Sequence, residues 1–124
     1  MARLTPEKKY EKDFMAWCSA RDMKAIKGPT ANTGGFPDRF VQLQSCGGTI
    51  YVEFKGTSDY DLTPRQRWWK RYLKASSPHR YFVVDSPESL AYLKYACEIL
   101  MEIGPELVAY ELELIKKAKE KRAL

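Results

Sequence analysis

The sequence predicts one α/β domain in which helices cover a mixed β-sheet. Three observations indicate this class. Helical periodicity follows the Thr-Pro pairs at 5–6 and 63–64, apolar residues alternate at 49–55, and a short apolar run stands at 81–84. Helices and strands that interchange along a chain in this way pack as a sheet with helices on its faces.

The first helix is predicted to begin after Thr5, which can cap it, with Pro6 in the first helical position. We expect it to run to about Met23 and to bury an apolar stripe. A short extended piece follows at 24–27. The stretch 28–35 is rich in glycine and proline and predicts a loop. The stripe consists of Tyr10, Phe14, Trp17, Cys18 and the stem of Arg21.

A β-hairpin is predicted in the middle of the chain. Its strands are 39–43 and 49–55, and the turn chemistry between them comes from Cys46-Gly47-Gly48. A polar loop at 56–62 follows the second strand.

The second half of the chain predicts a helix from Thr63 to about Ala75, the strand 81–84, and a helix that starts at Ser86-Pro87-Glu88. Gly104-Pro105 is expected to end that helix. A last amphipathic helix is predicted at about 106–121, which makes the element order α-β-β-β-α-β-α-α. Its apolar stripe is Leu107, Val108, Leu112, Ile115 and Ala118.

The composition is that of a single globular domain: 124 residues, 44% hydrophobic and 13% aromatic. The sequence has no leader-like start and no apolar run near 18 residues, so neither secretion nor a membrane span is expected. Its three cysteines form no C-x-x-C pair and there is one histidine, which argues against structural zinc. We therefore expect buried, reduced thiols and a cytoplasmic location.

Charge is unevenly distributed within the net charge of +5. Residues 63–80 carry six basic side chains and no acidic one, whereas residues 31–62 carry four acidic and two basic ones. An acidic patch in a basic chain suits a divalent cation held where a polyanion docks. An ordinary solvated surface is the alternative.

The strand 49–55 carries the first candidate site residues. Side chains alternate between the faces of a strand, so Glu53 and Lys55 share one face, roughly 7 Å apart, and the other face is apolar. Asp38 opens the preceding strand, and the hairpin should bring it close to this pair. Two carboxylates and an ammonium offer hard oxygen ligands for Mg²⁺ or Mn²⁺ and a group that can orient water. A plain solvent-facing strand remains the alternative.

These residues and their neighbours resemble the virus-type replication-repair (VRR-NUC) family of the PD-(D/E)xK nucleases. The similar segments are Gly35-Phe36-Pro37-Asp38-Arg39, then 52–56, then 62–69, and finally 79–86, in the order typical of the family. The resemblance covers about residues 5–96. It implies a PD-(D/E)xK-like core followed by a C-terminal helical extension at about 105–122.

The resemblance implies a metal ion held by Asp38, Glu53 and the backbone carbonyl of Phe54, with Lys55 placing the attacking water. It also places a first-helix glutamate of the cleft at Glu11, for which an ordinary surface position is the alternative.

Gln66 is assigned to the active site by the same resemblance. Thr63-x-x-Gln66 also fits a capping box, in which the glutamine side chain reaches back to the N-cap amide. The two roles are compatible.

Phosphate contacts are predicted from basic residues near the loop and on the second helix. They are Lys27, Arg39, Arg65 and Lys70. Lys70 belongs to a basic arc of that helix with Arg67, Arg71 and Lys74, for which a solvated helix face is the alternative, above all at Arg71 and Lys74. Trp68 and Trp69 are interpreted as packing residues, and His79 as structural.

The expected activity is metal-dependent hydrolysis of DNA by a homodimer, with branched DNA such as four-way junctions as the substrate that the resemblance implies. Two alternatives are a related nuclease with another substrate, such as a restriction-type or DNA-end enzyme, and a non-catalytic nucleic-acid-binding module.

Overall fold

The computed structural model describes residues 3–29 and 34–123. It contains three helices and four strands within these ranges. In chain order they are α1 (Pro6–Ser19), β1 (Ala25–Lys27), β2 (Arg39–Leu43), β3 (Gly48–Phe54), α2 (Pro64–Ser76), β4 (Tyr81–Val84) and α3 (Pro87–Ala123). Residues 30–33 of the predicted loop lie outside the described residues.

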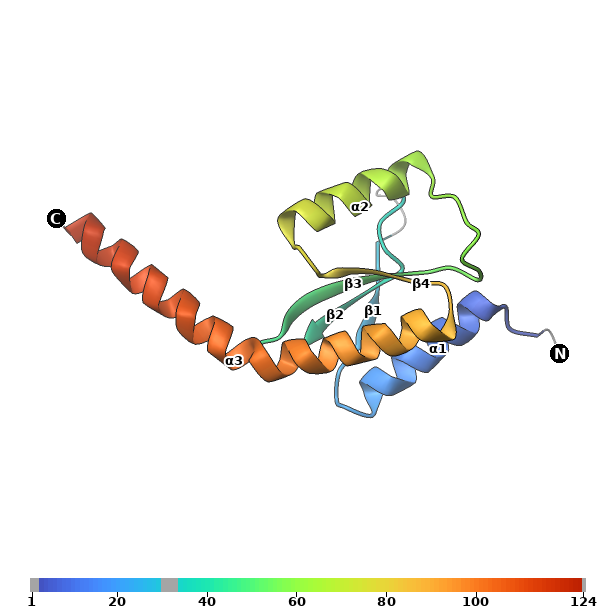
Figure 1. The fold of residues 1–124 in the computed structure, drawn as a ribbon, viewed down its shortest axis with the longest axis horizontal. Coiled ribbons are helices and arrows are strands. Elements are labelled where there is room, and N and C mark those ends of the chain that lie inside the picture. Colours follow the sequence, from blue (N-terminus) through green and yellow to red (C-terminus); the bar gives the residue numbers. More distant parts are fainter. Residues whose placement is uncertain (1–2, 30–33, 124) are drawn as a thin grey trace.

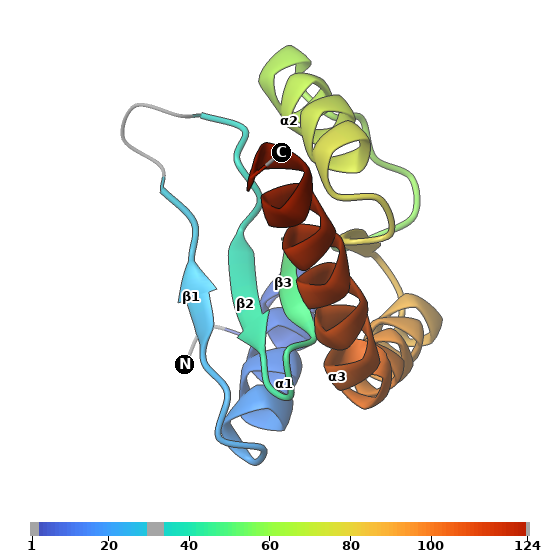
Figure 2. The same cartoon turned by 90° about the vertical axis from the view of Figure 1, so that its left-hand side faces the viewer.

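The four strands form one mixed sheet in the order β1-β2-β3-β4, of which Figure 2 shows β1, β2 and β3 side by side. The first three are antiparallel neighbours, and β4 runs parallel to β3. A parallel neighbour needs a crossover connection, which here is α2. The predicted α/β class with a mixed sheet is confirmed.

Helices cover both faces of the sheet (Figure 1). The helices α1 and α3 pack side by side on one face, and α2 lies over the other. The core between the sheet and the α1–α3 layer is made of alternate strand residues and the apolar stripes of the two helices. Its fully buried members include Phe14, Cys18, Val41, Ile50, Val52, Val84, Leu93 and Cys97.

The first helix is shorter than predicted. Thr5 caps it by accepting a hydrogen bond from the Lys8 amide, as the sequence indicates. It ends at Ser19 because the chain turns at 20–22, where Asp22 adopts a left-handed conformation with φ 57°. Short polar side chains tolerate that conformation better than most residues do.

The predicted helix end at Gly104-Pro105 is wrong, because α3 continues through both residues to Ala123. Gly104 is buried against the β2–β3 turn, and a side chain there would collide with the carbonyl oxygen of Ser45. The glycine therefore serves close packing, and the helix axis changes direction near it (Figure 1).

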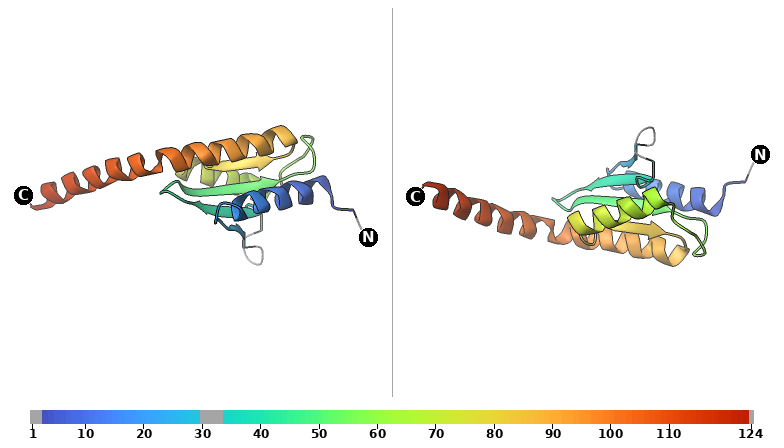
Figure 3. Two further views of the ribbon diagram at one scale, coloured as in Figure 1. Left: turned by 90° about the horizontal axis from the view of Figure 1, so that it is seen from below. Right: turned by 90° about the horizontal axis from the view of Figure 1, so that it is seen from above.

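The part of α3 after Pro105 extends away from the rest of the fold (Figure 3). We call residues 106–122 the arm. Nearly all of its side chains are exposed, including large apolar ones. The exposed apolar residues are Leu107, Tyr110, Leu112, Leu114 and Ile115. Within residues 3–29 and 34–123, the structure has no helix that combines the length and apolar character needed to cross a bilayer.

The three cysteines are free thiols, but Cys46 is exposed in the β2–β3 turn, so the expectation that all three are buried is wrong for it. Cys18 and Cys97 are buried in the core, and burial raises their pKa values to about 11 and about 12. Thiols with pKa values this high are poor nucleophiles at neutral pH, so both act as small core residues.

Candidate active site

Asp38 and Glu53 face each other where β2 and β3 begin to separate. The register pairs Arg39 with Val52, so the next residues along, Asp38 and Glu53, stand opposite each other just beyond the last pair. The carboxylate of Asp38 accepts a hydrogen bond of 2.8 Å from the Phe54 amide. That amide has no strand partner on the β2 side, so the Asp38 side chain is fixed in the place of a backbone acceptor.

Glu53 is the one buried charged residue of the described chain, with 3% of its surface exposed. Burial raises its pKa to about 9, and the hydrogen bond with Asp38 and the negative charge of Asp38 add to the shift. The charge of Lys55 opposes the shift without cancelling it. Two acids in contact in a dry site compete for one proton. Without a cation, Glu53 therefore stays protonated at neutral pH.

Lys55 and Gln66 complete the centre. The Lys55 ammonium donates to Gln66 Oε1 at 3.4 Å and lies 5.8 Å from the centre of the Tyr60 ring. The same Gln66 oxygen accepts from the Thr63 amide at 3.0 Å, and Thr63 Oγ1 accepts from the Gln66 amide at 3.2 Å. The capping box is therefore present, and its glutamine also reaches the lysine of the centre.

The loop that leads into Asp38 is anchored on α2. Gly35 has φ +89° and its backbone packs against Arg65 and Gln66, so that a side chain would come within 2.6 Å of the Gln66 amide nitrogen. Phe36 then packs edge-on against Trp69 with ring centres 4.9 Å apart. These two contacts fix the distance between β2 and the start of α2, and with it the position of Gln66 relative to Asp38.

Glu11 lies in a different environment from the one implied by the resemblance. Its carboxylate accepts from Arg39 Nε at 3.0 Å and from Lys8 Nζ at 3.2 Å. Burial raises its pKa, but the hydrogen bonds from Arg39 and Lys8 outweigh that effect and lower it overall. Glu7, one helical turn earlier, is the first-helix acid whose charge acts on Glu53.

Two tyrosines lie beside the centre that the sequence did not indicate. Tyr81 is buried at the start of β4, and burial together with the charge of Glu53 raises its pKa. Tyr60 lies in the loop before α2, and burial followed by the charges of Asp85 and Glu53 raises its pKa. Tyr81 could be found only once β4 was known to pair in parallel with β3, and the loop around Tyr60 has no periodicity to interpret.

The predicted phosphate-binding residues are spread over the fold. Arg39 is half-buried and also donates to the Ala25 carbonyl, so its guanidinium is engaged by the protein. Lys27 is exposed opposite Arg39 on the edge strand. Arg65 is exposed at the start of α2 and packs on the loop at Gly34. Lys70 lines a cleft between α2 and the preceding loop.

The interpretation of Trp68 as a packing residue is wrong. Trp69 packs against Phe36, but Trp68 is 50% exposed and stacks on the equally exposed Tyr72, with 5.4 Å between ring centres. The exposed aromatic pair follows the outer surface of α2. His79 is exposed and has φ 64° in the turn before β4, which fits a structural role.

The donor set of the centre fits a hard divalent cation. The carboxyl oxygens of Asp38 and Glu53 meet there, and the Phe54 peptide lies beside them because its amide is bonded to Asp38. Within residues 3–29 and 34–123, no group of three acidic, histidine or cysteine side chains could enclose an ion. A set of two carboxylates is nevertheless typical of Mg²⁺ sites, in which water and substrate phosphate supply the other ligands.

No family model matches the chain, and no curated protein is similar to it. The resemblance to the VRR-NUC family stays a prediction from the motifs, and the case for function rests on the geometry of the centre.

Proposed function

We propose that this protein is a metal-dependent nuclease that hydrolyses DNA phosphodiester bonds at the centre formed by Asp38, Glu53, Lys55 and Gln66. The observation that carries the proposal is the buried acid pair. Burying a carboxyl against a second carboxylate, with 3% of its surface exposed, costs folding free energy, and such groups are concentrated at functional sites. A divalent cation between the two acids would replace the proton of Glu53 and bind both carboxylates.

The roles of the side chains follow from their contacts. Asp38 is held by the Phe54 amide, so its free oxygen is available as a ligand without reorganisation. Lys55 is aimed by Gln66 and can hold the attacking water or a phosphate oxygen. A bound Mg²⁺ or Mn²⁺ supplies neutralisation of the phosphate charge and a lower pKa for bound water. Gln66 ties this chemistry to the N-terminus of α2 through the capping box.

Four-way junctions are the substrate class that we propose, together with a homodimeric enzyme. A junction presents two equivalent strands related by a two-fold axis, and a symmetric dimer would bring one centre to each. The arm and the helical turn before it support self-association, because Ile103, Leu107, Tyr110 and Leu114 follow at coiled-coil spacings and are all exposed.

The charges of the arm favour an antiparallel pairing of two copies. The first half carries three acidic residues and no basic one, at 106, 111 and 113, and the second half carries five basic residues, at 116, 117, 119, 121 and 122, with one acidic residue, Glu120. Antiparallel arms would place the acidic half of one copy beside the basic half of the other, whereas parallel arms would align like charges.

Cleavage of defined DNA substrates tests the nuclease function. Labelled linear, flapped and four-way DNAs are incubated with the protein in Mg²⁺, Mn²⁺ and EDTA. We expect cleavage with either metal, none in EDTA, and the fastest cleavage on the four-way junction. Cleavage of linear DNA as fast as the four-way junction would contradict the junction preference but not the nuclease function. DNA binding without cleavage in either metal would favour a non-catalytic binding module.

Mass measurement in solution tests the dimer. Leu114 is exposed and belongs to the coiled-coil stripe, so Leu114→Glu should produce monomers that keep the fold and the metal site. These monomers should lose paired incisions on a junction. A wild-type protein that is monomeric at micromolar concentration yet makes paired cuts would contradict the dimer and leave the nuclease function intact.

A further inference from the structure

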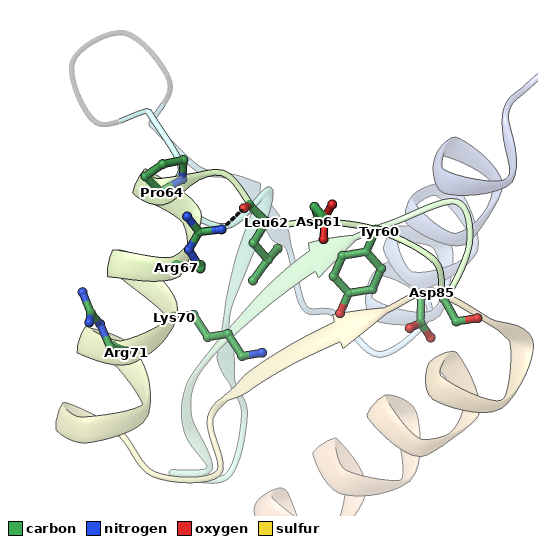
Figure 4. A pocket seen from close by; sticks show the side chains of 9 residues that line it. Tyr60, Asp61, Leu62, Pro64, Arg67, Lys70, Arg71 and Asp85 are labelled. Atoms are coloured by element: carbon green, nitrogen blue, oxygen red, sulfur yellow. Dashed lines mark hydrogen bonds between the residues drawn. The ribbon is translucent and has the colours of Figure 1, made fainter.

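A second feature next to the centre is an open cleft of about 820 Å³ between α2 and the loop that precedes it. Figure 4 shows the cleft from close by, with α2 forming one wall and the loop and the end of β4 forming the other. Its lining side chains are Ser58, Tyr60, Asp61, Leu62, Pro64, Arg67, Lys70, Arg71 and Asp85.

The α2 wall of the cleft is basic, and two of its cations have no partner. Arg67 donates to the Leu62 carbonyl at 2.6 Å, which ties the helix to the loop. Among the described residues, Lys70 and Arg71 have neither a hydrogen bond nor an ion pair through their side chains. The Lys70 ammonium points across the cleft toward Tyr60, whereas the Arg71 side chain extends away from Tyr60 along the outer side of α2 (Figure 4). An unpaired cation inside a cleft and a second one at its rim suit an anionic chain that enters from the α2 side.

The acidic residues of the cleft lie on its other wall. Asp85 accepts a hydrogen bond of 3.1 Å from Ser89 Oγ at the start of α3, and Asp61 is exposed on the loop. Their charges would repel a polyanion from that wall. An anionic backbone entering the cleft is therefore expected to follow α2.

Tyr60 connects the cleft to the carboxylate centre. Its ring lies 5.8 Å from the Lys55 ammonium on one side, and on the other side it lines the cleft. The charges of Glu53 and Asp85 both act on its hydroxyl. A nucleic-acid strand in the cleft would thus be separated from Lys55 of the centre by the Tyr60 side chain.

We infer that this cleft binds the sugar-phosphate backbone of one nucleic-acid strand beside the bond to be cut, with Lys70 and Arg71 as its phosphate contacts. The position of the strand beside the bond to be cut rests on the proposed nuclease function. The inference itself concerns the binding of the strand and not its cleavage. A strand carries one negative charge per nucleotide, and Lys70 and Arg71 are the cations of the α2 wall that no side chain of the protein already neutralises. Lys70 and Arg71 both belong to the basic arc from which the sequence predicts phosphate contacts.

Binding in the absence of metal tests the inference separately from catalysis. The variant is Lys70→Ala with Arg71→Ala, and the matched control is Lys9→Ala with Lys12→Ala, which removes two exposed cations from α1 on the opposite face of the sheet. Affinity for a labelled single-stranded oligonucleotide is measured by fluorescence anisotropy in EDTA at several salt concentrations. Thermal melts establish that both variants fold.

We expect the Lys70/Arg71 variant to bind about tenfold or more weakly and to lose about one to two from the slope of log affinity against log salt. The control should keep the wild-type slope. A Lys70/Arg71 variant with the wild-type slope, or a control that loses as much, would overturn the inference even if the wild type cleaves DNA. Loss of slope in the first variant alone would support it even if no cleavage is found.

Discussion

Two glutamates of this chain are held largely away from water in opposite electrostatic surroundings. Glu53, on β3, contacts the carboxylate of Asp38, and its pKa is raised to about 9. Glu11, on α1, is held by Arg39 and Lys8, and its pKa is lowered. The second arrangement is an ion pair that stabilises the fold. The first places two acids together without a matching cation, which is expected of a site that binds one.

The largest effect on cleavage is expected from removing the carboxyl group of Asp38 or of Glu53. Asp38→Ala and Glu53→Ala should each reduce cleavage at least about a thousandfold, because each removes a metal ligand and several kcal/mol of transition-state stabilisation. Gel assays of cleavage in Mg²⁺ and Mn²⁺ measure this effect. DNA binding in EDTA serves as the control for folding. Near wild-type cleavage by either variant would show that the assigned centre is wrong.

Stability should depend on pH in a way set by Glu53. Below its ordinary pKa of about 4.5, the carboxyl is protonated in both the folded and the unfolded chain. As pH rises toward 9, the unfolded chain ionises and the folded protein does not, so the free energy of unfolding should fall across this range.

Glu53→Gln removes this dependence, because an amide stays neutral at every pH. At pH 7 without metal, the variant should be more stable than the wild type by on the order of 1–3 kcal/mol while remaining inactive. Urea unfolding of both proteins in EDTA at pH 5, 7 and 8.5 measures the difference. Parallel stability curves for the two proteins would contradict the raised pKa.

Gln66 has two proposed roles, one as a helix cap and one in catalysis. Two substitutions distinguish these roles. Gln66→Ala removes both the cap and the contact with Lys55, so it should cost about 1 kcal/mol of stability and much of the activity. Gln66→Glu keeps a capping acceptor but adds a negative charge beside the acid pair. It should melt like the wild type and lose activity. Full activity in Gln66→Glu would reduce Gln66 to a cap.

The smallest effect on cleavage is expected from substituting Glu11, the glutamate that is paired with basic side chains. Glu11→Gln leaves the guanidinium of Arg39 without its carboxylate, which should cost about 1 kcal/mol of stability. Cleavage should fall far less than in Glu53→Gln, because no ligand of the centre is lost. Thermal melts and cleavage rates of the two variants, measured side by side, give the contrast. An equal loss of cleavage in both would return Glu11 to the active centre.

The approach of Asp38 to Glu53 could be predicted because a hairpin couples local pattern to distance. The alternation in β3 and the turn before it fix the register, and the register alone places the two acids opposite each other. The dual role of Gln66 was also readable, since the capping box and the motif use the same side chain.

The partner of Glu11 could not be predicted, because it depends on how α1 packs across the sheet onto Arg39. The continuation of α3 was missed for a similar reason. Gly104-Pro105 ends most helices, but here the glycine packs against Ser45 in the β2–β3 turn. Neither the turn nor its distance from the helix is present in the local sequence.

The cleft beside the centre likewise depends on tertiary placement. Lys70 and Arg71 are adjacent members of a basic helix face in the sequence, but the wall opposite them comes from Tyr60 and Asp85, which belong to a loop and to a strand end. Only the fold places these segments around one cleft.

The central claim is that Asp38 and Glu53 form a binding site for a divalent cation. Calorimetric titration of the metal-free protein with Mn²⁺ at pH 7, repeated in buffers with different ionisation enthalpies, tests it most directly. We predict one site whose occupation releases about one proton, because the cation must displace the proton held by Glu53. Glu53→Gln should not bind, and Glu11→Gln should bind like the wild type. The claim would be contradicted by a wild type that binds no Mn²⁺, or by unchanged binding in Glu53→Gln.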